Sequence, residues 1–297
     1  MGFLVKDGVL KKYIPKRGIR NVVIPYGINV IGSEAFGECK NIQNVTIPDS
    51  VTIIGDWAFW NCTSLRNIKI PDSVRSICSG AFCGCTSLKS FVIPDGVKYI
   101  DGETFEDCIS LENIIIPEGI ESISYQAFSG CSSLKHIAIP NSIETMDYPV
   151  FDDCEKLERI TLFGFDIDIN EFDFYDTDIS DIRSMLKNKN YNCEINKYIK
   201  FSMVSQIFLQ TGQPEAESYI KNNFEELITY FIDKNDYDTF KKLLDTDRLV
   251  NENNIMKIID YSIKHTQESG DLQIQAYIMD YKNRKFPDLD PMENLKL

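Results

Sequence analysis

The chain is poor in the residues that most catalytic and metal sites use. Its 297 residues include only two histidines and two tryptophans. It also lacks a Gly-rich phosphate loop, a Gly-x-Ser-x-Gly nucleophile motif and a His-Glu-x-x-His pair. The sequence therefore predicts a protein that is not an enzyme and that has no cofactor, catalytic residue or metal site.

Basic residues and long apolar runs are scarce as well. Lysine and arginine together number 31 against 45 acidic residues, so the formal net charge is −14. A nucleic-acid partner is not expected, because a phosphate backbone requires a basic stripe. No stretch is long enough to span a bilayer, and residues 1–12 lack the apolar core of a signal peptide. As written, the sequence predicts a cytoplasmic monomer; removal of a leader would instead leave a secreted or cell-surface protein.

Internal repetition is what the chain has in abundance. The dipeptide Ile-Pro recurs every 23 residues, beginning at positions 24, 47, 70, 93, 116 and 139. One further column with the same step holds Phe36, Phe59, Phe82, Phe105, Phe128 and Phe151, and another holds Cys39, Cys62, Cys85, Cys108, Cys131 and Cys154. One coil cannot bury its own apolar face, so stacked coils must share a core. We therefore expect a solenoid of six coils over residues 22–165.

Each coil contains a short strand that proline ends. Around Ile68, apolar residues alternate with polar ones, which is the period of a half-buried strand. Pro71 has no amide hydrogen and ends that strand, and a second extended stretch over 74–77 precedes a helical turn at Phe82. At the N-terminus, the pair Asp7-Gly8 between apolar segments is typical of a hairpin turn, so residues 1–21 are predicted to cap the solenoid.

The repeat frame is specific: Ile-Pro, two residues, Val, two residues, Ile-Gly, two residues, Ala-Phe, two residues, Cys, two residues, Leu. Residues 47–65 carry it nearly unchanged, and six tandem copies resemble the BspA-type leucine-rich repeat. Thr104 and Val150 depart from the alanine before phenylalanine. The resemblance implies a right-handed leucine-rich-repeat solenoid with short parallel strands. It also implies an alternative function as a secreted or surface adhesin for host proteins or glycans.

Six of the nine cysteines are explained by the repeat itself. Equivalent side chains in adjacent coils point in parallel, which disulfide geometry does not allow, so buried reduced thiols are expected. Cys78 and Cys83 occupy columns that other coils fill with small, polar or charged residues or with tryptophan, and we expect them to be exposed. Together with Cys85 they provide three thiols without a fourth ligand, so a structural zinc site is not predicted.

After residue 162 the repeat frame ends and the composition becomes acidic. Asp166, Asp168 and Asn170 match the first ligand positions of an EF-hand loop. Glu171 and Thr177 stand where that loop needs glycine and glutamate, so an acidic capping loop is predicted instead of a calcium site. We place the domain boundary here, with residues 166–297 as an acidic linker and helical domain.

Apolar residues in the last third of the chain follow the helical period. The predicted helices cover 178–189, 194–210, 214–233, 236–245, 252–267 and 271–284. A pattern repeated 35 residues apart bears a weak resemblance to stacked hairpins of the ankyrin kind. The expected fold class is therefore α+β, a leucine-rich-repeat solenoid followed by an all-α helical-hairpin domain.

The outward positions of the strands are the most promising binding surface. Val92, Ile115 and Ala138 are adjacent in the stack and form an apolar strip beside Asn113 and His136. The predicted ligand-binding residues are Asn67, Lys69, Val92, Asn113, Ile115, His136, Ala138 and Arg159. Ordinary strand propensity on a solvent face, or cover by the helical domain, would explain the same strip. We predict a protein-interaction scaffold whose protein partner is unidentified.

Two tryptophans offer a second surface on the opposite side of the coils. Trp57 and Trp60 belong to the helical turn of one coil. Aromatic anchors are enriched at interaction hot spots, but such side chains also pack between neighbouring coils. The sequence leaves both interpretations open.

Overall fold

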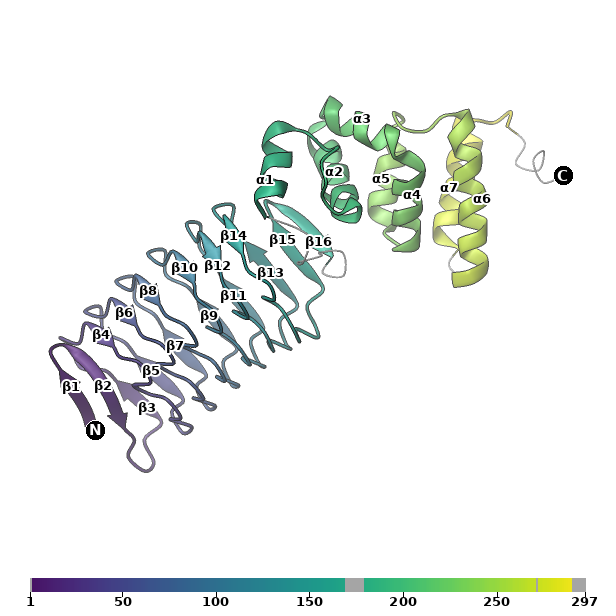
Figure 1. Ribbon diagram of the computed structural model, residues 1–297. Helices are drawn as coiled ribbons and strands as arrows, with labels where there is room; N and C mark the ends of the chain where they lie inside the picture. The colour runs from purple at the N-terminus through teal and green to yellow at the C-terminus, as the bar shows by residue number, and fades with distance from the viewer. Residues whose placement is uncertain (1, 169–178, 271, 290–297) are drawn as a thin grey trace. The chain divides into compact units, whose positions relative to one another are not determined.

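The computed structural model describes residues 2–168, 179–270 and 272–289 (Figure 1). The chain divides into two compact units, Met1–Arg183 and Ser184–Leu297, and each is described by itself. The first is a solenoid of short parallel strands and the second is helical, so the predicted fold class is confirmed.

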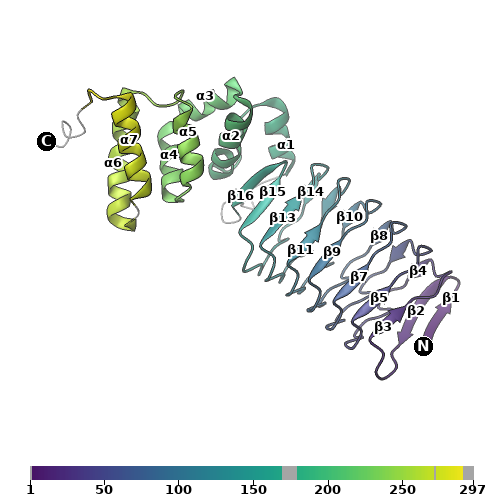
Figure 2. The same cartoon turned by 180° about the vertical axis from the view of Figure 1, so that it is seen from behind.

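Two rows of strands run along the solenoid (Figures 1 and 2). The first row comprises β3 (Asn21–Val23), β5 (Asn44–Thr46), β7 (Asn67–Lys69), β9 (Ser90–Val92), β11 (Asn113–Ile115), β13 (His136–Ile139) and β15 (Arg159–Leu162). The second row comprises β4 (Val30–Ile31), β6 (Ile53–Ile54), β8 (Ser76–Ile77), β10 (Tyr99–Ile100), β12 (Ser122–Ile123) and β14 (Thr145–Met146). Paired strands of the two rows are parallel and each residue faces its equivalent 23 positions on, as Asn44 faces Asn67. The repeat period is thus the register of the sheets.

Stacked aromatic rings fill the centre of the solenoid. The six phenylalanines of the repeat column stack with centroid separations of 4.9, 5.3, 5.9, 5.5 and 5.6 Å along the chain. Five of them, from Phe36 to Phe128, are completely buried. Because the repeat has no insertions, every ring meets its own equivalent in the next coil, and one continuous core results.

The cysteine column forms a second ladder beside the aromatic one. All nine cysteines are free thiols. The thiol of Cys62 donates to the carbonyl oxygen of Phe36 at 3.2 Å, and each later cysteine of the column donates to the phenylalanine carbonyl of the preceding coil in the same way. Burial raises the pKa of Cys108 and of Cys154 to about 12. These thiols therefore stay protonated and act as packing groups that also satisfy backbone carbonyls.

The expectation that Cys78 and Cys83 are exposed is wrong. Cys78 is half-buried, and Cys83 is only 7% exposed. The thiol of Cys83 contacts a carboxylate oxygen of Glu106 in the next coil at 3.4 Å. The stacking coil covers this position, which the residue types in the column did not indicate.

A hairpin begins the solenoid. Strands β1 (Gly2–Lys6) and β2 (Val9–Ile14) pair antiparallel, and the left-handed backbone of Asp7 and Gly8 (φ 52° and 75°) makes the turn. β2 then pairs in parallel with β4. Tyr13 stacks on Phe36 at 5.1 Å and so continues the aromatic ladder into the cap.

A second hairpin follows the last coil. Strand β16 (Phe165–Asp168) pairs antiparallel with β15 through a turn at Phe163 and Gly164, which have φ of 52° and 81°. The predicted boundary between residues 165 and 166 falls inside this strand. The acidic positions from 169 to 178, including the rest of the EF-hand match, lie outside the described residues.

Helix α1 (Ile179–Asn188) begins in the first unit. Its Arg183 guanidinium donates to the carbonyl oxygens of Asn141 (3.0 Å) and Ile143, and lies 5.1 Å from the ring centroid of Phe163. This side chain therefore ties the start of the helix to the last turns of the solenoid.

Six further helices lie in the described residues of the second unit: α2 (Lys197–Thr211), α3 (Pro214–Asn222), α4 (Phe224–Asp233), α5 (Tyr237–Asp245), α6 (Glu252–Ser269) and α7 (Gln273–Lys285). They form hairpins in sequence order, and α4 packs against α6 while α5 packs against α7. No helix in the described part of the chain is both long and apolar enough to cross a membrane.

The predicted single helix over 214–233 is wrong, because the chain breaks at Asn223. Its backbone leaves the helical region (φ −116°, ψ 19°), and its side-chain amide donates to the carbonyl oxygen of Tyr219 at 2.8 Å. Asparagine side chains compete in this way for backbone groups and end helices. Residues 214–233 thus form two helices, α3 and α4.

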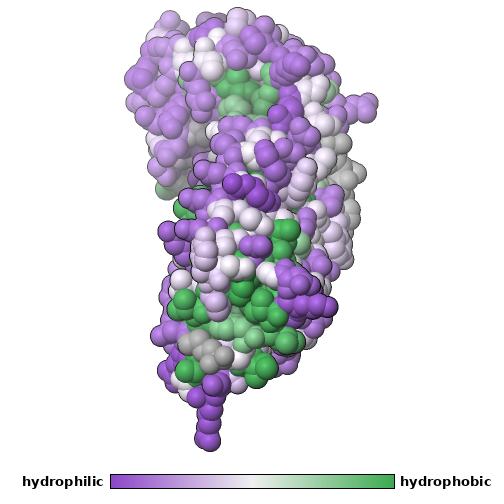
Figure 3. Space-filling view, turned by 90° about the vertical axis from the view of Figure 1, so that its left-hand side faces the viewer, coloured by the Kyte–Doolittle hydropathy of each residue, from purple (hydrophilic) through white to green (hydrophobic). Residues whose placement is uncertain are grey.

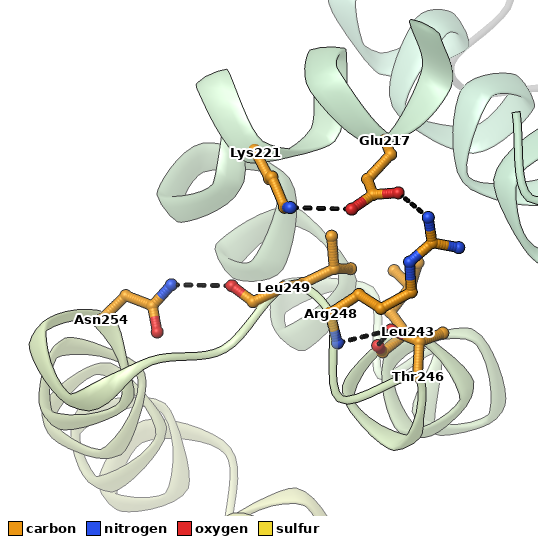
Figure 4. A network of polar contacts seen from close by, with 7 residues as sticks. All are labelled: Glu217, Lys221, Leu243, Thr246, Arg248, Leu249 and Asn254. Atoms are coloured by element: carbon orange, nitrogen blue, oxygen red, sulfur yellow. Dashed lines mark hydrogen bonds and ion pairs between the residues drawn. The ribbon is translucent and has the colours of Figure 1, made fainter. Parts of the chain in front are cut away.

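Charged and capping side chains tie α3 to the connection between α5 and α6 (Figure 4). The carboxylate of Glu217 accepts from Lys221 at 2.7 Å and pairs with the guanidinium of Arg248. Asn254 donates to the carbonyl oxygen of Leu249 at 3.0 Å, while Arg248 also lies over the Phe208 ring. Polar side-chain contacts of this kind recur between successive hairpins.

Candidate protein-interaction face

The eight residues predicted to bind a partner all lie on the first row of strands. Each of them is exposed, and the residues between them in the sequence point into the core, as Phe91 does at 2% exposure. Alternation along a strand is the cause, since successive side chains point to opposite faces. The structure does not join all eight in one hydrogen-bonded sheet. Asn67 and Lys69 belong to the sheet of β3, β5 and β7, whereas the others lie on β9–β11 and β13–β15–β16.

Three aliphatic side chains form the centre of this surface, and we name Val92, Ile115 and Ala138 the apolar strip. Val92 faces Ile115 directly across the β9–β11 pair, and the two are 57% and 61% exposed. β13, which carries the exposed Ala138, lies beside β11. Exposed aliphatic side chains on successive strands of the row give a partner an apolar contact.

An asparagine ladder covers the N-terminal end of the same row. The side-chain amide of Asn44 donates to Asn21 at 2.6 Å, and the amide of Asn67 donates to Asn44 at 3.1 Å. Each amide is therefore oriented by its neighbour, and the ladder has its hydrogen-bond donors directed toward β3. These contacts hold the side chains in fixed positions before any ligand arrives.

A polar cluster ends the apolar strip at its other side. His136 Nε2 lies 2.7 Å from the hydroxyl of Thr161, and that hydroxyl donates to Asp166 at 2.5 Å. A carboxylate oxygen of Asp166 is 4.0 Å from the same histidine nitrogen. Since the hydroxyl hydrogen goes to Asp166, the imidazole donates to Thr161. The cluster orients His136 beside Ala138.

Sequence reasoning placed Asp166 in a linker and so missed its part in this face. The position became significant only because β16 folds back along β15 and brings Asp166 opposite Thr161. The signal available in the sequence was Gly164, which allows the tight turn that reverses the chain.

The tryptophan pair packs between coils. Trp57 and Trp60 meet edge to face at 6.3 Å, and both are partly buried. A Cβ atom at Gly80 in the next coil would lie only 2.6 Å from the Trp57 ring. The indole therefore occupies the space that glycine leaves open, as the packing interpretation requires.

The described residues offer neither an arranged metal-binding group nor an ionised cysteine thiol at Cys83. Across residues 2–168, 179–270 and 272–289, no group of three or more His, Cys, Asp or Glu side chains is arranged to hold a metal ion. Burial raises the pKa of Cys83, which keeps its thiol protonated and unreactive. The arrangement on the strand row is suited to contact and hydrogen bonding.

Comparison with known proteins supports the repeat assignment. The model of the BspA type leucine rich repeat region matches residues 13–102 and 76–202, in six copies. No curated protein matches the chain.

Among solved structures, a leucine rich cell surface protein from Faecalibacterium prausnitzii is 25% identical with a TM-score of 0.43, and the match covers 56% of each chain. A leucine-rich repeat protein from Bacteroides ovatus is 31% identical with a TM-score of 0.41, covering 54% of this chain and 51% of that one. A leucine rich repeat protein from T. pallidum is 26% identical with a TM-score of 0.41, covering 52% of this chain and 87% of that one. The chain thus spans about half the length of the first two. Because the family model covers more than half of the sequence, the chain belongs to the BspA-type leucine-rich-repeat family.

Proposed function

We propose that the chain is a non-enzymatic interaction scaffold that holds a protein partner on the first row of strands. The observation that carries the proposal is the apolar strip, in which Val92 and Ile115 are more than half exposed although they stand side by side on a rigid sheet. Membership of a repeat family with binding roles supports it.

The residues around the apolar strip indicate what kind of partner surface would fit it. Apolar side chains of the partner would lie over Val92 and Ile115, while His136 and Arg159 offer polar contacts at one end. Lys69 and the asparagine ladder offer donors at the other end. A protein surface or extended segment with a central apolar group and a polar rim fits this pattern.

The test is a double substitution on the strip. Val92→Asp with Ile115→Asp places two carboxylates on the contact surface, and we expect it to abolish capture of the partner while far-UV circular dichroism stays unchanged. The matched control is Ile53→Asp with Tyr99→Asp, which changes two exposed apolar residues on the second row of strands. Partners recovered by the wild type and the control but not by the strip variant are then purified and their affinities measured. Unchanged capture by the folded strip variant would refute this face.

The alternative function is a secreted or surface adhesin that binds host proteins or glycans. It is supported by the similar Faecalibacterium prausnitzii protein, which is described as a cell surface protein. Protease treatment of intact cells of the source organism distinguishes the two, because an adhesin is degraded and an internal scaffold is protected. The codons upstream in the native gene provide an independent check for a leader.

A further inference from the structure

The N-terminal hairpin has features that its role as a cap does not require. β1 pairs with β2 on one side, and among the residues that the structure describes no strand pairs with its other edge. An unpaired edge presents a row of backbone N–H and C=O groups, which is a template for a further strand. The hairpin therefore leaves an open position beside β1.

Aliphatic side chains surround this open edge. Leu4 lies opposite Lys12 and Gly2 opposite Ile14 in the β1–β2 register, so Leu4 and Ile14 share the outward face of the hairpin. Each of the two is 59% exposed, and Val5 on the edge strand is 45% exposed. Figure 3 looks at this end of the solenoid and shows an apolar patch gathered there, with hydrophilic surface around it. The inward residue Tyr13 already completes the aromatic ladder, so the outward side chains of Leu4 and Ile14 are not needed for the core.

The charge of the hairpin is opposite to that of the rest of the chain. Residues 2–20 contain one acidic residue and six basic ones, in a chain whose formal net charge is −14. The basic residues are Lys6, Lys11, Lys12, Lys16, Arg17 and Arg20, and all are exposed. None of them forms an ion pair with a carboxylate in the described part of the chain, where Lys12 instead donates to the backbone carbonyl of Glu34 at 2.9 Å. Unpaired cations on an acidic protein indicate an anionic partner.

We propose that the edge of β1 is a second docking site, which takes an extended acidic polypeptide segment as an added β-strand. Backbone hydrogen bonds along Gly2–Lys6 would hold the segment, Leu4 would contact its apolar side chains, and the surrounding lysines would pair with its carboxylates. This surface is separate from the apolar strip of the proposed scaffold function.

The same features argue against two other occupants of this edge, a second copy of the chain and a lipid bilayer. A second copy paired edge to edge would bring two basic hairpins together, and a lysine on an edge strand such as Lys6 is a common protection against pairing of identical chains. A lipid bilayer would leave the unpaired backbone groups of β1 without hydrogen-bond partners in an apolar medium. An acidic strand satisfies both the backbone groups and the charges.

Peptide binding to the full chain tests the proposal. The probe is a fluorescent, end-blocked hexapeptide that alternates glutamate with valine, measured by fluorescence anisotropy at low and high salt. Two controls share its length: the same peptide with N-methylated valines, which loses backbone donors, and a peptide alternating lysine with valine. We expect binding of the first peptide, weaker at high salt, about tenfold weaker binding of the N-methylated peptide and none of the basic one. Slower amide hydrogen exchange in residues 2–6 on peptide addition would place the contact on β1.

Variants of the chain make the result specific. Leu4→Glu with Lys6→Glu reverses the charge at the edge and should weaken peptide binding about tenfold, whereas Lys156→Glu, at an exposed lysine of the last coil, should not change it. Absence of acidic-peptide binding, or equal binding of the N-methylated peptide, would overturn the proposal. So would concentration-dependent dimerisation in ultracentrifugation that the Leu4→Glu/Lys6→Glu variant abolishes. Sedimentation with phosphatidylserine-containing vesicles that the peptide does not displace would likewise identify a membrane as the occupant.

Discussion

The solenoid and the helical unit are held together by different kinds of contact. In the solenoid, hydrogen bonds between coils join mostly backbone groups at a separation of about one repeat, such as Phe36 N–H to the carbonyl oxygen of Ala58 at 2.7 Å. In the helical unit, contacts between hairpins join charged and phenolic side chains, such as Tyr261 to Asp233 at 2.8 Å and Tyr281 to Asp247 at 3.1 Å. Backbone groups thus link the coils of the first unit, while in the second unit these side-chain contacts add to a buried apolar core.

The two units can be observed separately. Both tryptophans of the chain lie in the solenoid, and the helices lie between residues 179 and 285 in the described part of the chain. Tryptophan fluorescence therefore reports unfolding of the solenoid, and ellipticity at the helical wavelength reports unfolding of the helices. Each prediction below uses this pair of signals.

Alkaline pH should have the largest effect, because it should destabilise the solenoid more than the helical unit. Burial raises the pKa of the repeat-column thiols, that of Cys108 to about 12, whereas an unfolded thiol ionises near 9. A group whose native pKa is raised stabilises the fold below its unfolded pKa and loses that contribution as the pH rises. The Cys108 thiol should then reduce the solenoid's free energy of unfolding by about 1.4 kcal/mol per pH unit between pH 9 and its native pKa, and the other buried thiols of the column act in the same direction.

Urea titrations between pH 8 and 10 measure this loss by fluorescence. The helical tyrosines contribute little until the upper end of this interval, because their unfolded pKa is 10.0 and burial raises the native pKa of Tyr261 to about 12. Cys108→Ala should make the solenoid's free energy of unfolding fall less steeply with pH, because it removes the contribution of one buried thiol. A fluorescence transition that is independent of pH over this interval would contradict the assignment of the thiols as buried, protonated groups.

Phe105→Ala should destabilise the solenoid alone. Its ring is completely buried and stacks between Phe82 and Phe128, at 5.9 and 5.5 Å. Removal of a buried aromatic ring costs about 3–5 kcal/mol. The fluorescence transition should shift to lower urea while the helical transition stays in place. The matched control is Ile259→Ala, a completely buried residue of α6, which should shift only the helical signal.

Tyr281→Phe should have a smaller effect, confined to the helices. The phenol donates to Asp247 at 3.1 Å and the ring is otherwise buried, so the substitution removes one hydrogen bond to a charged acceptor and little packing. We expect a loss of about 1–2 kcal/mol in the helical transition. Tyr26→Phe, on a solenoid side chain that is 85% exposed, should change neither signal. A shift of the fluorescence transition by Tyr281→Phe would show that the units do not unfold separately.

Acid should produce the smallest effect. The groups with shifted pKa should lower the free energy of unfolding of the helical unit and raise that of the solenoid. The hydrogen bond from Lys221, together with Arg248, lowers the pKa of Glu217, so its contribution is present above the ordinary value of 4.5 and is lost as the pH falls below it. In the solenoid, burial raises the pKa of Asp101, whose unfavourable charge is neutralised by the same acidification. The helical transition should weaken below pH 4.5 relative to the solenoid transition, and Glu217→Gln should reduce that difference.

Much of the solenoid could be predicted from the sequence because its strongest interactions repeat. A column of phenylalanines at a fixed step requires each ring to meet its equivalent, so the period alone predicts the register of the sheets and the positions of the core. The helical unit has no such redundancy. One residue, Asn223, divides a segment whose apolar pattern is continuous, and the outcome depends on a local competition between side chain and backbone.

The repeat, the reduced thiol ladder and the exposed positions of the strand row could be predicted from the amino-acid pattern. Which side chains meet across coils or hairpins of unequal sequence became known only from the folded chain. Cys83 is covered by Glu106 of the next coil, and Asp166 reaches Thr161 and His136 because β16 turns back along β15. The physical reason is that a periodic pattern specifies contacts between equivalent residues. Contacts between residues that are not equivalent in the repeat depend on the positions that these residues take in the folded chain.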